Sequence, residues 1–162
     1  MFKISSQEEF GLRFLVQLAK ANGREVSLSD IAEKEGTSLS YVRKILGILR
    51  SAGLVISSKG VKGGSSLSRS PSEITLVEIF HILKPEPHEF SCKDFTGNLP
   101  ECANFSDCGV RPVMSLLRKK VNEFLSNITL SQLVKEEKDV LSHLQSKLKQ
   151  EPQYKLETAV GS

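Results

Sequence analysis

The sequence lacks the features that mark membrane and secreted proteins. No apolar run approaches the roughly 20 residues of a membrane-spanning helix, and the first nine residues contain no signal-peptide core. The chain is also poor in cysteine, with three among 162 residues. We therefore expect a cytoplasmic protein without membrane association, whose cysteines serve as metal ligands or redox thiols and not as a disulfide framework.

Signatures of catalysis are missing as well. No Cys-His or Ser-His pair lies in the sequence context that a nucleophile and its base require, so we expect that the protein is not an enzyme. With 39% hydrophobic residues, the chain can bury a proper core. Its length suits one compact domain with an extension.

Acidic residues are missing from one long stretch, Thr37 to Arg69, although 19 occur in the chain. The stretch carries +6 and the whole chain +3, so everything outside the stretch sums to −3. This concentration of positive charge suits a polyphosphate partner, although a solvated basic face has the same composition. The basic residues are Arg43, Lys44, Arg50, Lys59, Lys62 and Arg69.

The pattern within this stretch predicts a recognition helix followed by a wing. Ser38 can cap a helix in which apolar residues recur at helical spacing, and Gly53 ends it. Residues 54–56 then indicate a strand, 59–64 a basic glycine-rich loop and 66–69 the returning strand. The apolar positions of the helix are Val42, Ile45, Leu46 and Leu49.

A second helix is predicted just upstream of Ser38. Ser27 and Asp30 have the S-x-x-D form of a helix start, and Gly36 can take the positive φ that ends a helix. The two helices must therefore turn sharply against each other, which predicts a helix-turn-helix.

Two further helices complete the expected domain. A capping box of Ser6 and Glu9 starts the first, and Thr75 starts the second, which ends before Pro85. We predict a mainly α fold with a small β-hairpin wing, in which a winged helix-turn-helix domain spans residues 1–84. The buried positions expected in these helices are Phe10, Phe14, Leu15, Leu18, Leu76, Ile79, Phe80 and Leu83.

From Val26 to Leu83 the sequence resembles the bacterial winged-helix transcription regulators of the Rrf-two superfamily, typified by IscR, NsrR and RirA. The segments SLSDIAE, SLSYV and LRSAGLV and the glycine-rich wing occur in the family's order and spacing. With the cysteine-bearing half that follows, the resemblance covers roughly residues 1 to 135. It implies a homodimeric repressor that binds a double-stranded DNA operator.

All three cysteines, Cys92, Cys102 and Cys108, lie in a loop over residues 85–109 that has neither helical nor strand periodicity. A loop of this length in a compact chain needs disorder or an organising ligand. Soft thiolates select iron-sulfur clusters, zinc or cuprous copper. The resemblance implies an iron-sulfur cluster, 4Fe-4S or 2Fe-2S, that senses iron, nitric oxide or redox state; structural zinc and a metal-free thiol or partner sensor are the alternatives.

The fourth ligand departs from the best-known pattern. IscR-type relatives use a histidine shortly after the third cysteine, but residues 109–111 offer none. NsrR-type relatives use a carboxylate near the amino terminus of the opposite subunit, and Glu8 lies at the matching place, with Glu9 beside it. The resemblance thus implies Glu8 of the partner chain, while His88 is a rival ligand.

Residues 110–135 are expected to form the dimerisation region, followed by a charged C-terminal tail over 136–162. Apolar residues alternate in steps of four and three, which is the seam that a helix offers to a partner helix. The alternative is that this helix packs on its own domain. The seam positions are Val110, Met114, Leu117, Val121, Phe124 and Ile128.

The amino end of the recognition helix and the wing are expected to contact DNA. Arg43 or Lys44 can read guanine in the major groove, and the glycine loop can approach the minor groove closely. IscR-like proteins can carry an acidic residue at the place of Arg43, so the base preference should differ. We expect a dimer on two half-sites about 34 Å or a multiple apart. The expected contacts are Ser38, Ser40, Tyr41, Arg43, Lys44, Lys59, Lys62, Gly63 and Gly64.

Overall fold

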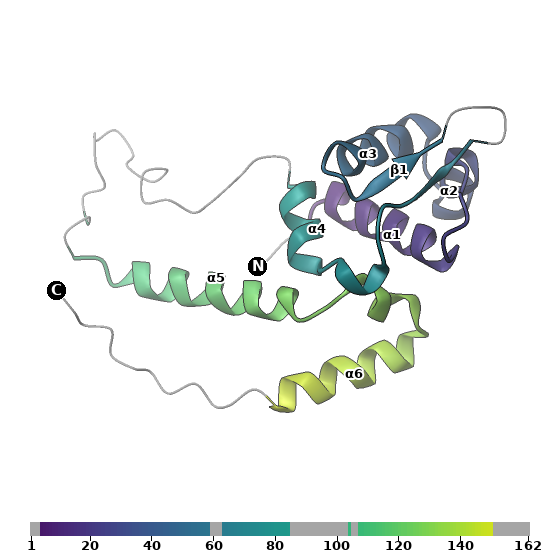
Figure 1. The fold of residues 1–162 in the computed structure, drawn as a ribbon. Helices are drawn as coiled ribbons and strands as arrows, with labels where there is room; N and C mark the ends of the chain where they lie inside the picture. Colours follow the sequence, from purple (N-terminus) through teal and green to yellow (C-terminus); the bar gives the residue numbers. More distant parts are fainter. Residues whose placement is uncertain (1–3, 59–62, 85–103, 105–106, 151–162) are drawn as a thin grey trace.

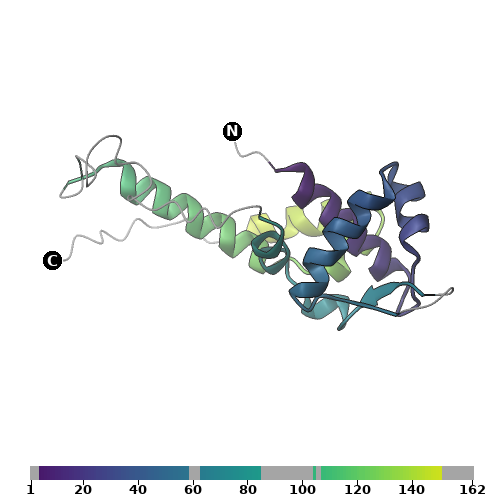
Figure 2. The ribbon, with the colours of Figure 1, turned by 90° about the horizontal axis from the view of Figure 1, so that it is seen from above.

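The computed structural model describes residues 4–58, 63–84, 104 and 107–150. The helices α1 to α4 gather around one core with a two-stranded hairpin at its edge, and α5 projects from this cluster (Figures 1 and 2). The described part of the chain is thus mainly α with a small hairpin, as predicted. Among the described residues, no helix has the length and apolar character to cross a membrane.

Helix α1 (Ser6–Lys20) begins one residue earlier than predicted. Ser5 caps it, and the capping box joins Ser5 with Glu8, so the predicted pairing of Ser6 with Glu9 is wrong. Two overlapping S-x-x-E boxes fit the sequence equally well. The earlier start adds a backbone hydrogen bond from the Glu9 N–H to the Ser5 carbonyl at 3.0 Å.

The helix-turn-helix forms as the sequence predicts. Helix α2 (Leu28–Glu35) is capped by Ser27 and ends at Gly36, which has φ 62°. Helix α3 (Leu39–Ser51) is capped by Ser38, and all four of its predicted apolar positions are buried. The left-handed conformation at Gly36 reverses the chain within a few residues because glycine has no Cβ to oppose it.

The wing is an antiparallel pair of β1 (Val55–Ser57) and β2 (Ser65–Leu67), in which Val55 faces Leu67 and Ser57 faces Ser65. Strand β1 is displaced by one residue from its predicted bounds, and β2 starts one residue earlier and ends two residues earlier than predicted. Ser65 explains the shift of β2, because it also forms a bridge with Val26, which joins the wing to the segment before α2. The hairpin is therefore anchored at its base to the helix-turn-helix.

The core closes with residues from both halves of the chain. Helix α4 (Leu76–Leu83) starts at the Thr75 cap as predicted and follows a short 3-10 helix, η1 (Pro71–Glu73). A second 3-10 helix, η3 (Leu130–Val134), returns to α1 and η1. Its residue Leu130 is fully buried, and the bridge between Thr75 and Thr129 fixes this return. Residues 128–134 thus help to build the core of the amino-terminal domain.

Helix α5 (Val110–Ser126) is supported only near its carboxyl end. Phe124 and Leu125 pack against the core, whereas Val110, Val113 and Leu117 are 65%, 63% and 54% exposed. The predicted seam is wrong at its last position. Ile128 lies beyond the end of α5, at Ser126, and is 2% exposed in the core. Helix α6 (Glu137–Gln150) follows within the charged tail.

Candidate nucleic-acid interface

Helix α3 presents exposed polar and basic side chains near its amino end. Arg43 and Lys44 are exposed, and so is Ser40. Ser38 caps the helix. Its hydroxyl accepts the Tyr41 N–H at 3.2 Å and shares a 3.0 Å hydrogen bond with the Ser40 hydroxyl. This serine pair holds the first turn of the helix whose side chains we expect to meet base edges.

Tyr41, an expected DNA contact, also has a packing role. Its ring meets Phe10 edge-to-face, with the ring centroids 5.6 Å apart, and the side chain is half-buried. Such aromatic pairs stabilise beyond the area that they bury. The contact fixes α3 against α1 and so sets the angle at which the recognition helix is presented.

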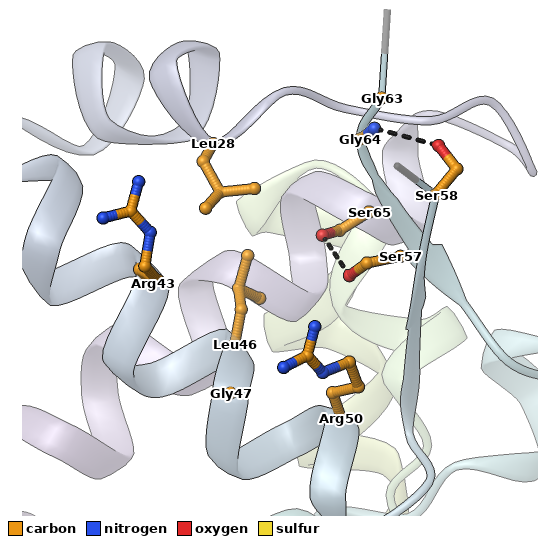
Figure 3. A pocket seen from close by; sticks show the side chains of 10 residues that line it. All are labelled: Leu28, Arg43, Leu46, Gly47, Arg50, Ser57, Ser58, Gly63, Gly64 and Ser65. Carbon is orange, nitrogen blue, oxygen red and sulfur yellow. Dashed lines mark hydrogen bonds between the residues drawn. The ribbon is translucent and has the colours of Figure 1, made fainter. Parts of the chain in front are cut away.

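A hollow of about 270 Å³ separates α3 from the wing. Figure 3 shows Arg43 and Arg50 on the helix side, with Gly47 between them along the helix, and serines and glycines on the wing side. None of the described lining residues is acidic. The lining consists of Leu28, Arg43, Leu46, Gly47, Arg50, Ser57, Ser58, Gly63, Gly64 and Ser65.

The wing wall of the hollow is held by hydroxyl groups. Ser57 and Ser65 share a hydrogen bond between their hydroxyls at 3.0 Å, and Ser58 donates to a Glu25 carboxylate oxygen at 2.7 Å. Gly64 is buried, and a Cβ there would meet the Val26 carbonyl oxygen at 2.8 Å, so only glycine allows this close approach. Lys59 and Lys62 lie outside the described residues.

Two arginines of the basic stretch, Arg50 and Arg69, are placed differently. Arg69 donates from one guanidinium nitrogen to both carboxylate oxygens of Glu78 at 2.5 Å, and this hydrogen bonding raises the pKa of Arg69 above its ordinary value. Arg50 lines the hollow instead, where no ion-pair partner among the described residues neutralises it. The structure thus assigns Arg69 to a carboxylate and leaves Arg50 available to a ligand.

Of the predicted cluster ligands, Cys108 is the cysteine that lies within the described residues. It is half-buried and directly precedes Gly109, the N-cap of α5, which makes no side-chain cap hydrogen bond. Cys92, Cys102 and His88 lie outside the described residues. No group of three or more possible metal ligands occurs among the described residues, and the ligand set remains a prediction.

Glu8 is tied to its own helix through one carboxylate oxygen. Its Oε2 accepts the Ser5 N–H at 2.8 Å and the Ser5 hydroxyl at 2.7 Å. Neither bond uses Oε1, which can therefore face another donor or a metal. Glu9 is exposed and lies 3.8 Å from Arg13, a weak surface pair.

The helix-turn-helix and its hairpin define a winged-helix protein. The sequence pattern of the Rrf2 family, described as "Iron-dependent Transcriptional regulator", matches residues 4–136. The chain therefore belongs to the Rrf2 family, whose members are transcriptional regulators that bind DNA.

Named relatives and solved structures agree with this assignment. The HTH-type transcriptional regulator IscR of Serratia proteamaculans is 34% identical over 116 residues, which are 72% of this chain and 68% of that protein. The oxidized form of CymR from Staphylococcus aureus has TM-score 0.65 and 30% identity over 83% of this chain and 98% of that one. T. potens IscR has TM-score 0.63 and 28% identity, with 94% of each chain covered.

Proposed function

We propose that the protein is a homodimeric transcriptional repressor that binds a two-half-site operator and senses iron, nitric oxide or redox state through an iron-sulfur cluster. It works in the cytoplasm on chromosomal DNA, and no catalytic role is part of the proposal. The observation that carries the DNA-binding part is the exposed basic face of α3 beside the wing. Ser40, Arg43 and Lys44 contact base edges, and the wing approaches the minor groove at Gly63.

The exposed stripe of α5 supports the dimer. Val110, Val113 and Leu117 recur at helical spacing on one face, and each is more than half exposed. A row of large apolar side chains on a projecting helix is costly in water unless a partner covers it. A second copy supplies the same stripe, so the two α5 helices pack along each other in an isologous interface.

The position of Cys108 supports the sensor. Helix amino ends carry partial positive charge, so an anionic, thiolate-ligated cluster is favoured beside the start of α5. Cys92, Cys102 and Cys108 would hold the cluster, which supplies a redox- and ligand-sensitive centre when bound. A change at this end of α5 would reach the dimer interface directly and so shift the spacing of the two winged domains.

The fourth ligand in this proposal comes from the partner chain. Helix α5 is about 25 Å long at 1.5 Å per residue, and its amino end lies away from α1 in both ribbon views (Figures 1 and 2). A cluster at Cys108 therefore has easier access to Glu8 of the second subunit than to Glu8 of its own. A single oxygen ligand supplied in this way is readily displaced, which suits a sensor.

A metal-free thiol sensor is the second candidate. The relative CymR from Staphylococcus aureus was solved in an oxidized form, and it matches this chain with 30% identity. In this version the cysteines respond to oxidants directly, by forming sulfenic acid or a disulfide. Zinc held by the same thiolates is a further possibility with the same fold.

The visible spectrum of anaerobically purified protein, with iron and sulfide assayed on the same sample, tests the sensor. Absorption between about 320 and 460 nm with matched iron and sulfide supports the cluster. A protein that stays colourless after reconstitution contradicts the cluster and leaves the metal-free thiol sensor or the zinc site as candidates. Selection from a random pool of DNA duplexes tests the regulator separately, since a protein that enriches no sequence contradicts operator binding whatever its colour.

A further inference from the structure

Gly47 is an unusual residue for the middle of α3. A glycine in a helix interior costs about 1 kcal/mol relative to alanine. The packing of the described residues does not require it, because a Cβ built at Gly47 would meet none of their atoms within 4 Å. At Gly11 in α1, by contrast, a Cβ would overlap the side chain of Leu83. The open space at Gly47 is therefore available to something outside the chain.

The side chains around Gly47 indicate what that space can hold. Arg43 and Arg50 flank it on the helix, so two guanidinium groups line one wall of the hollow (Figure 3). On the other wall, Ser57 and Ser65 share one hydrogen bond, which uses the proton of only one hydroxyl. When Ser65, which is 1% exposed, donates to the exposed Ser57, the Ser57 proton remains available for donation. Two cations and a free hydroxyl donor suit a phosphate group.

The geometry points to this hollow as the binding site of a DNA backbone phosphate. Arg50 holds the phosphate with help from the Ser57–Ser65 hydroxyl pair, at the place where one DNA strand crosses between α3 and the wing. This inference rests on the proposed DNA binding and deepens it. When α3 lies in the major groove and the wing lies in the minor groove, the sugar-phosphate strand between the grooves must pass between them. Gly47 leaves room for that strand close to the helix.

Arg50 is thus a positioning residue that fixes register and carries no sequence information. Arg69 does not share this role, because Glu78 holds its guanidinium. Glu25 accepts the hydroxyl of the lining residue Ser58 at 2.7 Å, so its negative charge lies close to the hollow and opposes the phosphate. The geometry therefore assigns opposite effects to the two charges: Arg50 strengthens binding of any duplex and Glu25 weakens it.

The test uses the full-length protein, a duplex that it has enriched from a random pool, and a duplex of unrelated sequence. Arg50→Gln should weaken the binding of both duplexes by the same factor, on the order of tenfold. It should also lower the slope of log affinity against log salt concentration by about one. Glu25→Gln should tighten both. Gly47→Leu places a side chain in the hollow and should weaken both, with helix content unchanged by circular dichroism.

Lys138→Gln is the matched control, because it also removes one positive charge but lies on the exposed face of α6, on the other side of the domain from α3 (Figure 1). It should change neither affinity nor salt slope. Equal losses in Lys138→Gln and Arg50→Gln would overturn the assignment. So would a selective loss of the enriched duplex in Arg50→Gln, which would make Arg50 a base-reading residue.

Neutral methylphosphonates, placed one at a time in the enriched duplex, locate the phosphate. Substitution at the contacted phosphate should weaken wild-type binding but leave Arg50→Gln binding unchanged, because the variant has already lost that contact. Additive losses at every position would overturn the inference. If the wild type enriches no duplex, both the proposed function and this inference are wrong. If the wild type enriches a duplex but Arg50→Gln binds it as tightly as wild type does, only the inference is wrong.

Discussion

The Oε2 atom of Glu8 accepts two hydrogen bonds from Ser5, one from the backbone N–H at 2.8 Å and one from the hydroxyl at 2.7 Å. The carboxylate that is proposed to complete the cluster therefore also starts α1. Glu8→Ala would remove both the cap and the ligand, so an alanine variant alone would not distinguish the two tasks. The chemistry of the capping box offers a way to separate the two.

Glu8→Gln should retain the cap and lose the ligand. A glutamine at this position still accepts hydrogen bonds from the N-cap residue, whereas a neutral amide is a poor iron ligand. We expect an unfolding temperature of the cluster-free protein close to wild type. The visible absorption of the reconstituted protein should decay faster in air or with nitric oxide, as measured by time-resolved spectra.

Ser5→Ala is the converse control. It removes the side-chain cap and should lower the free energy of unfolding by about 1 kcal/mol, but it keeps the carboxylate and should leave the cluster decay rate near wild type. Identical decay in wild type and Glu8→Gln would exclude Glu8 as a ligand and favour Glu9 or His88.

Leu117→Glu should dissociate the proposed dimer. Leu117 lies in the exposed apolar stripe of α5, and a carboxylate there would face its own copy across a two-fold interface. Sedimentation should show a monomer at concentrations where wild type is dimeric. Ser115→Glu adds the same charge on a different, exposed face of α5 and should remain dimeric. A dimeric Leu117→Glu protein would place the interface elsewhere.

Arg43→Ala should relax base choice. Arg43 is exposed on α3, and a bidentate contact with guanine contributes about 1–3 kcal/mol of discrimination. Selection with the variant should therefore return sequences that are degenerate at one position in each half-site. The prediction is wrong if the variant enriches the same sequence as wild type.

The same substitution should have opposite effects at two helical glycines. Gly11→Ala should lower the free energy of unfolding by about 1–3 kcal/mol, because the fully buried Leu83 must move out of the way. Gly47→Ala should raise it by about 0.5–1 kcal/mol, because the methyl group meets open space and alanine favours the helix. Urea unfolding measures both changes in the free energy of unfolding. If the two changes had the same sign, the packing described for Gly11 and Gly47 would be contradicted.

Arg13→Met should destabilise the contact between α1 and α2. The Arg13 Nε donates to the Glu35 Oε2 at 2.6 Å, and the Glu35 side chain is only 5% exposed. Removal of Arg13 would leave this carboxylate with the Gln17 amide, 2.7 Å from its other oxygen. A loss of about 1–3 kcal/mol in unfolding free energy is expected. The double variant Arg13→Met/Glu35→Met should lose less, because no buried charge is left unpaired.

The features that the sequence predicted well depend on local chemistry. Ser27, Ser38 and Thr75 each cap a helix as expected, because an N-cap needs only a side-chain oxygen and the next few N–H groups. Gly36 and Gly53 have positive φ just after α2 and α3. The absence of acidic residues from 37–69 likewise follows from composition and predicts where the basic surface lies.

The features that tertiary structure decided depend on residues far apart in the sequence. Ile128 continues a heptad pattern, but the chain turns after Ser126 and buries Ile128 beneath the winged domain. Arg50 and Arg69 look alike in sequence, and only the position of Glu78 separates their roles. Periodicity and charge specify which surfaces a segment can offer. Which partner meets each surface is set by packing of the whole chain, because burial and pairing energies exist only once distant segments are in contact.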